Sequence, residues 1–121
     1  MTDNLPESGI KMFKVDPPLS ANSGVFELRE FYVYPNPAKR VNPTIKVDCN
    51  VSDADVKLKI YTITGELVFE KDISSFYNSS KNAYEYTWDT RGKASGIYIY
   101  LIKATRGGKT LKETGKIGLI K

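Results

Sequence analysis

The side chains that could perform chemistry are few in this chain of 121 residues, and histidine is absent. Without histidine, imidazole acid–base catalysis and the Ser–His and Cys–His nucleophile pairs are excluded. Cys49 is the sole cysteine, which also excludes an intrachain disulfide and a cysteine zinc cluster. An enzyme would have to rely on carboxylates, Lys and Tyr. We therefore expect a non-catalytic protein that binds, anchors or supports, with no cofactor.

Two further features could still mark a site. Asp48, Asp53, Asp55 and Asp89 could offer oxygen ligands to a cation, but their spacing matches no calcium-binding loop, so no metal site is predicted. Cys49 lies on the apolar side of an alternating run, where a thiol is usually inert packing.

Positive charge is concentrated at the C-terminal end, although the net charge is only +4. From residue 103 onward, Glu113 is the only acidic residue among six basic ones. Such a patch can bind nucleic acid, but here no recognition motif accompanies it. Lysines on an edge strand commonly prevent unwanted pairing. We favour this second interpretation and expect no nucleic-acid partner.

The elements that must position these residues are short strands. Alternating apolar and polar residues, separated by Gly, Pro and Asn, are typical of strands with one face in a core and one in water. The predicted strands span residues 28–34, 44–51, 55–63, 67–69, 84–88, 96–104 and 110–120. The run 96–104 is apolar on both faces and predicts a central strand. Seven strands favour an all-β fold, an immunoglobulin-like antiparallel sandwich.

Residues 1–25 have a different composition, rich in Pro, Gly, Ser and Asn. We interpret them as a linker or the end of a preceding region, in which residues 11–15 could form an edge strand, and assign 26–121 to the sandwich. The N-terminus has neither the basic nor the apolar segment of a signal peptide. No apolar run approaches the ~20 residues of a membrane-spanning helix, so we expect a chain that does not span a membrane.

Prolines and glycines should define the turns. Pro35 and Pro37 end the first strand around Asn36, and Gly65 should supply a positive φ after the third. Asp89 can accept backbone N–H groups of the turn that follows it, and Gly96 permits close approach at the start of the central strand. Trp88 is predicted to be the largest core side chain, with its N–H bonded to a buried acceptor.

Four segments in register resemble a known family: residues 33–37 (VYPNP), 56–68 (VKLKIYTITGELV), 86–89 (YTWD) and 94–100 (ASGIYIY). They are similar to the C-terminal immunoglobulin-like modules of proteins exported by the type IX secretion system, which are related to the hook-capping immunoglobulin-like domain of flagella. The resemblance covers about residues 30–121. The motif positions, which we read as structural, are Tyr34, Pro35, Asn36, Pro37, Gly65, Trp88, Asp89, Gly96 and Tyr98.

The resemblance implies a sorting module that directs an attached N-terminal cargo domain to secretion or the cell surface. Its partner would be the outer-membrane secretion machinery. We expect recognition through the last strand, at Gly115, Lys116, Ile117 and Lys121, because a terminal strand can present its edge to another sheet. Since such modules end longer precursors, we expect this chain to be the C-terminal part of a larger bacterial protein.

Two other functions remain open from the sequence. One is a structural or assembly module, like the hook-capping relative or an accessory domain of a secreted hydrolase. The other is carbohydrate binding through exposed aromatic side chains. The candidates for that are Tyr32, Tyr61, Tyr77 and Tyr98 or Tyr100.

Overall fold

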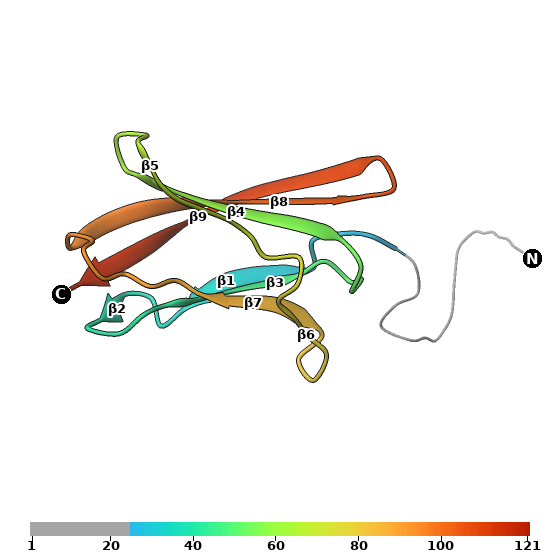
Figure 1. The fold of residues 1–121 in the computed structure, drawn as a ribbon, viewed down its shortest axis with the longest axis horizontal. Helices are drawn as coiled ribbons and strands as arrows, with labels where there is room; N and C mark the ends of the chain where they lie inside the picture. Colours follow the sequence, from blue (N-terminus) through green and yellow to red (C-terminus); the bar gives the residue numbers. More distant parts are fainter. Residues whose placement is uncertain (1–24) are drawn as a thin grey trace, which may run out of the picture.

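The computed structural model describes residues 25–121, all of them in strands, turns and loops. Residues 1–24, including the possible edge strand at 11–15, lie outside this range. Figure 1 shows two layers of strands packed face to face. The strands are β1 (Glu30–Tyr34), β2 (Ala38–Lys39), β3 (Thr44–Asp48), β4 (Asp55–Thr62), β5 (Leu67–Asp72), β6 (Tyr77–Asn78), β7 (Ala83–Thr87), β8 (Gly96–Arg106) and β9 (Lys109–Ile120).

One layer is a four-stranded sheet in the order β1-β3-β7-β6, and the other is a five-stranded sheet in the order β2-β9-β8-β4-β5. The prediction of an immunoglobulin-like sandwich is confirmed. Each of the seven predicted strands is present, and β2 and β6, of two residues each, are additional. The apolar strand β8 lies between β9 and β4, as its two-faced pattern predicts.

The core lies between the sheets, where the alternating residues of both layers meet. Ile45 and Val47 of β3 face Leu58 and Ile60 of β4, and all four are fully buried. Cys49 is 1% exposed, and burial raises the pKa of its thiol above the ordinary value. This agrees with a packing role, because the reactive form of cysteine is the thiolate.

The β8–β9 hairpin is the longest paired element, running without a shift of register from Gly96 opposite Leu119 to Arg106 opposite Lys109. Its turn is Gly107-Gly108, with φ of 57° and 81°. Two consecutive positive φ values suit the right-handed twist of the flanking strands, and glycine adopts them without steric cost. No helix long and apolar enough to cross a membrane occurs within residues 25–121.

Tyr84 of β7 is the largest buried side chain after Trp88, and its hydroxyl accepts a hydrogen bond from the Ala54 N–H at 2.9 Å. Burial raises the pKa of Tyr84 to about 12. In the unfolded chain it ionises near pH 10, so the unfolded state loses this proton first as the pH rises. The stabilisation is therefore complete below pH 10 and is lost between about pH 10 and 12.

We expect Tyr84→Phe to flatten this alkaline loss of stability. A rise of two pKa units corresponds to roughly 3 kcal/mol. Urea unfolding of both proteins between pH 8.5 and 11.5 measures the difference. The variant starts less stable at pH 8.5, because the Ala54 N–H loses its acceptor, but its free energy of unfolding should fall less steeply. Equal slopes would assign the alkaline loss to other tyrosines.

Candidate recognition strand and its clamp

The last strand, β9, is fastened to the segment that follows β1. The Asn36 side chain donates from Nδ2 to the Lys116 carbonyl at 2.8 Å and accepts from the Gly118 N–H at 2.9 Å. These are the bonds that a neighbouring strand would make. Two residues on, Ala38 and Lys39 pair in parallel with Leu119 and Ile120 as β2. We call Asn36 and β2 together the edge clamp.

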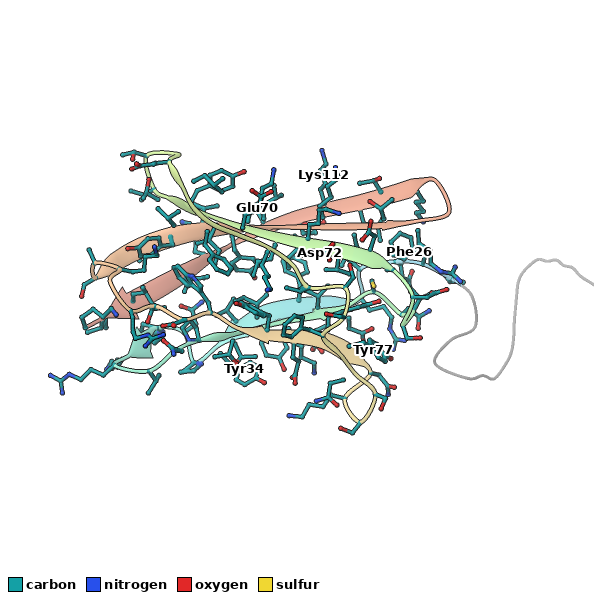
Figure 2. All side chains as sticks on the ribbon, in the orientation of Figure 1. Phe26, Tyr34, Glu70, Asp72, Tyr77 and Lys112 are labelled. Carbon is teal, nitrogen blue, oxygen red and sulfur yellow. The ribbon has the colours of Figure 1, made fainter. Side chains whose placement is uncertain are left out.

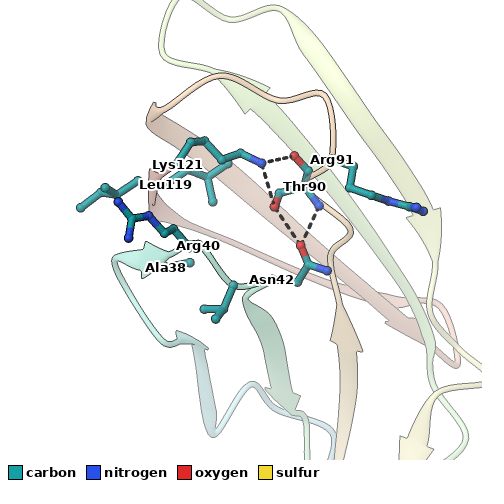
Figure 3. Close-up of a pocket in the computed structure, with 9 residues that line it drawn as sticks. Ala38, Arg40, Asn42, Thr90, Arg91, Leu119 and Lys121 are labelled. Carbon is teal, nitrogen blue, oxygen red and sulfur yellow. Dashed lines mark hydrogen bonds between the residues drawn. The ribbon is translucent and has the colours of Figure 1, made fainter.

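The end of the chain is held by a second set of bonds, and Figure 3 shows those that join Lys121, Thr90 and Asn42. The Lys121 ammonium donates to the carbonyl oxygen of Thr90 at 2.7 Å, and the Lys121 N–H donates to Ser95 Oγ. Thr90, 3% exposed, donates in turn from its N–H and hydroxyl to Asn42 Oδ1. Lys121, Thr90 and Asn42 line a hollow of about 310 Å³, together with Arg40 and Arg91.

Gly115 and Gly118 are sites of close packing. A Cβ at Gly115 would lie 2.5 Å from the ring of Tyr100, which covers this position from β8. A Cβ at Gly118 would lie 3.2 Å from Cβ of Pro37. The strand register is continuous at both, so neither marks a bulge. Glycine is present because neighbouring side chains occupy the space of its missing Cβ.

The structure corrects the expectation that the whole terminal edge is free. Asn36 and Arg40, whose N–H binds the Ile120 carbonyl, cover the edge at residues 116–120. Ile117 is fully buried, so no partner can contact it without unfolding the strand. Lys116 is exposed, and Lys121 is engaged with Thr90. Three of the four predicted recognition residues lie on β9, and Lys121 follows its end; of the four, only Lys116 offers its side chain to a partner.

The open part of β9 precedes the edge clamp. On an edge strand, every second residue points its N–H and C=O groups away from the neighbouring strand. On β9 these are the even-numbered residues, because Lys116, Gly118 and Ile120 use their outward groups to bind Asn36 and Arg40. The outward groups of Thr110, Lys112 and Thr114 therefore have no strand opposite them within the described part of the chain, since β2 reaches only Leu119 and Ile120. We call this segment, Lys109–Gly115, the open edge.

Three other motif residues make contacts within the domain. Trp88 is fully buried, with Tyr98 edge-on against it at 5.4 Å and Phe69 at 6.2 Å. The Tyr98 hydroxyl donates to the Ala94 carbonyl, which ties the start of β8 to the preceding loop. Tyr34 is partly exposed and donates to Glu85 on β7.

The turn positions behave as their types predict. Gly65 has φ of 95° and its N–H donates to the Thr62 carbonyl, which closes the β4–β5 turn. Asp89 accepts from the Arg91 N–H and forms an ion pair with the Arg91 guanidinium. These Arg91 hydrogen bonds hold the pKa of the Asp89 carboxyl below its usual range. Gly96, with φ of 153°, begins β8 opposite Leu119.

One expectation about Trp88 is wrong. Its indole Nε1 is buried and has no hydrogen-bond partner within residues 25–121. The ring instead packs against Phe69 and Tyr98, and its backbone N–H donates to the Pro43 carbonyl at 2.9 Å. The site favours aromatic packing over indole hydrogen bonding.

The alternative sites are not assembled. Asp53 pairs with Arg106 and Asp89 with Arg91, and no metal-binding group of three His, Cys, Asp or Glu residues occurs among residues 25–121. Tyr32 and Tyr61 lie on the outer faces of opposite sheets, and Tyr100 is buried. Tyr77 packs edge-on against Tyr84. The predicted carbohydrate candidates therefore form no common surface.

Sequence reasoning missed the residues that hold the C-terminus. Asn42, Thr90 and Ser95 are short polar residues in loops, and nothing in their local pattern points to residues near 120. The sequence makes Tyr100 a candidate for sugar binding. In the structure its ring fills the space next to position 115, which explains why that residue is a glycine. A glycine on one strand opposite an aromatic residue on the next was the available signal.

The edge clamp joins the two ends of one sequence pattern, VYPNP and the final basic strand. The family model described as "Secretion system C-terminal sorting domain" matches residues 32–115. The chain belongs to this family. The expectation from the resemblance is confirmed, and the matched range ends where the predicted recognition residues begin.

Two solved structures are similar to this chain. Dimeric latent PorU from Porphyromonas gingivalis is 27% identical with a TM-score of 0.59, over 74% of this chain and 9% of that chain. The β-glucuronidase from Parabacteroides merdae is 11% identical with a TM-score of 0.48, over 78% of this chain and 14% of that chain. This chain thus spans a small part of both. A search of curated proteins gave no significant match.

As a sorting domain, the chain directs export by the type IX secretion system, and the protein that carries it is sent to the cell surface or secreted. A sorting domain of this family is not itself catalytic. This agrees with the absence of histidine from the sequence.

Proposed function

We propose that the secretion machinery of the outer membrane recognises β9 by adding a strand to its open edge. In this proposal residues 26–121 form the sorting domain, and a cargo domain precedes it in the parent protein. The edge clamp keeps residues 116–120 in register, and the exposed Lys116 gives the end of the strand a positive charge.

The observation that carries this proposal is the division of β9 into a covered and an uncovered half. Within residues 25–121, no strand pairs with the outward backbone groups of Thr110, Lys112 and Thr114, which lie in a row. An extended peptide can satisfy all of them by β-augmentation, in which main-chain hydrogen bonds give affinity and alternate side chains give specificity. At the residues that follow, Lys116 and Gly118 already bond the Asn36 side chain along the same edge. An added strand would continue this line of hydrogen bonds.

Thr114→Pro tests this mode of recognition. The N–H of Thr114 points away from β8, so proline removes an outward donor without removing a bond of the β8–β9 ladder. The full chain would be fused to a periplasmic reporter in a host with the secretion system. We expect export to fall at least tenfold for Thr114→Pro, while the control Thr114→Ser is exported normally.

The charge at the end of the strand is tested separately by Lys116→Glu, with Lys81→Glu on the β6–β7 loop as the matched control. Truncation after Gly115 is unsuitable, because it removes the buried Ile117 and Leu119. Circular dichroism and thermal unfolding establish that each variant folds. Normal export of folded Thr114→Pro would contradict edge recognition. No export of the intact chain would favour the assembly-module alternative.

A further inference from the structure

The outer face of the five-stranded sheet has an apolar stripe with lysines on both sides. In β8, Ile97, Ile99 and Leu101 point away from the core, since Tyr98 and Tyr100 between them are buried. Ile97 is 47% exposed. A central strand is usually covered on both faces when it is apolar on both. Within the described part of the chain no element covers this stripe.

The lysines come from both neighbouring strands. The register places Lys59 opposite Leu101 on one side and Lys116 opposite Ile99 on the other. At the end of the stripe Lys57, Lys103 and Lys112 form a row across three strands. Figure 2 shows Lys112 directed away from the four-stranded sheet. These eight side chains, Lys57, Lys59, Lys103, Lys112, Lys116, Ile97, Ile99 and Leu101, are called the lysine face.

The charges on the lysine face are only partly compensated. Lys57 lies 3.5 Å from Asp55 and 3.9 Å from Asp72, and Lys59 lies 3.9 Å from Glu70. No ion pair within residues 25–121 involves Lys103, Lys112 or Lys116. Like charges directly opposite each other on adjacent strands are destabilising, as are Lys103 and Lys112 here. An anionic partner would remove this repulsion.

We propose that the lysine face docks onto a membrane surface that carries anionic phosphate headgroups. Four of its lysines surround a shallow hollow of about 160 Å³, with Leu101 and Glu70 also on its lining. Headgroup phosphates would meet the ammonium groups there. The long lysine stems lie beside apolar surface while their charges reach the phosphates, and the exposed Ile97 contacts the boundary with the acyl chains.

The composition of the face favours a lipid surface over a protein partner. Protein interfaces are enriched in Arg and aromatic residues and depleted in Lys. Here every cation is a lysine, and the three apolar residues of the stripe are aliphatic, with Tyr61 as the one aromatic side chain beside them, opposite Ile99. Basic clusters beside apolar side chains are typical of surfaces that bind anionic lipids. Lys112 and Lys116 also lie on β9, but this inference does not depend on edge recognition, because the lysine face binds through side chains and the open edge through backbone groups.

Vesicle co-sedimentation of the full chain tests the proposal. We expect binding to vesicles of phosphatidylcholine and phosphatidylglycerol (70:30), decreasing as salt is raised, and little binding to phosphatidylcholine alone. Each lysine near an anionic surface contributes roughly a fivefold factor in partitioning. Lys103→Gln/Lys112→Gln should therefore bind about 30-fold more weakly. The control Lys46→Gln/Lys81→Gln, which has the same net charge and changes lysines of the other sheet and its β6–β7 turn, should bind at least tenfold more tightly than that variant.

Three results would overturn the proposal. The first is equal binding by the two double variants, which would make net charge the cause. The second is displacement of the protein from vesicles by millimolar inorganic phosphate at constant ionic strength, which would indicate a pocket for a free anion. The third is a dimer in sedimentation analysis that Ile97→Ser or the Lys103/Lys112 variant abolishes, which would make a second copy the occupant.

Ile97→Ser should weaken vesicle binding without changing thermal stability, because Ile97 is exposed.

Discussion

Replacing Trp88 with alanine is expected to lower the free energy of unfolding by roughly 3–5 kcal/mol. Trp88 is the largest fully buried side chain, and its removal leaves a cavity bordered by Phe69 and Tyr98. Trp88 follows β7 of the four-stranded sheet, whereas Phe69 and Tyr98 belong to the five-stranded sheet, so the site cannot collapse without moving one sheet against the other. The unpartnered Nε1 means that the loss comes from packing, not from a broken hydrogen bond.

Urea unfolding followed by circular dichroism measures this change, and Trp88→Phe is the matched variant. Phenylalanine retains the contacts of a six-membered ring and has no N–H, so it should be clearly less destabilising than alanine. If Trp88→Ala does not fold, Trp88→Phe still gives a measurable value. Since Trp88 is the only tryptophan, its native fluorescence should be blue-shifted and should move to the red on unfolding. Native emission like that of indole in water would contradict its burial.

Gly115→Ala is expected to destabilise the domain by roughly 1–3 kcal/mol, although alanine is ordinarily preferred to glycine within a strand. The added Cβ would lie 2.5 Å from Cζ and Oη of Tyr100. Tyr100 is 4% exposed and has Phe31 edge-on at 6.5 Å, so its ring has little room to move. The sign of the effect is therefore decided by packing and not by strand propensity.

A double-mutant cycle with Tyr100→Leu isolates this contact. Leucine lacks the ring atoms that approach Gly115, so Gly115→Ala in that background should be neutral or stabilising. Gly118→Ala serves as a control with a smaller cost, because its Cβ would lie 3.2 Å from Pro37. If Gly115→Ala costs the same in the native background and in the Tyr100→Leu background, the ring does not determine this glycine.

Much of the fold follows from local pattern. The alternation at residues 44–51 and 55–63 predicts β3 and β4, and the two-faced run at 96–104 predicts the central position of β8. Glycines at 65, 107 and 108 mark turns because positive φ is a local steric requirement. The family resemblance likewise depends on contiguous segments. These features need only the spacing of residues along one strand or one turn.

The candidate site could not be derived in this way, because its contacts join residues far apart in sequence. Asn36 binds residues 80 and 82 positions away, and Lys121 binds Thr90 across the end of the sandwich. Neither asparagine nor lysine carries a local signal for such a partner. The sequence by itself determined the strands, their inward faces and the family. Only the tertiary structure decided which half of β9 is covered and which lysines share a face, because pairing between distant strands sets both.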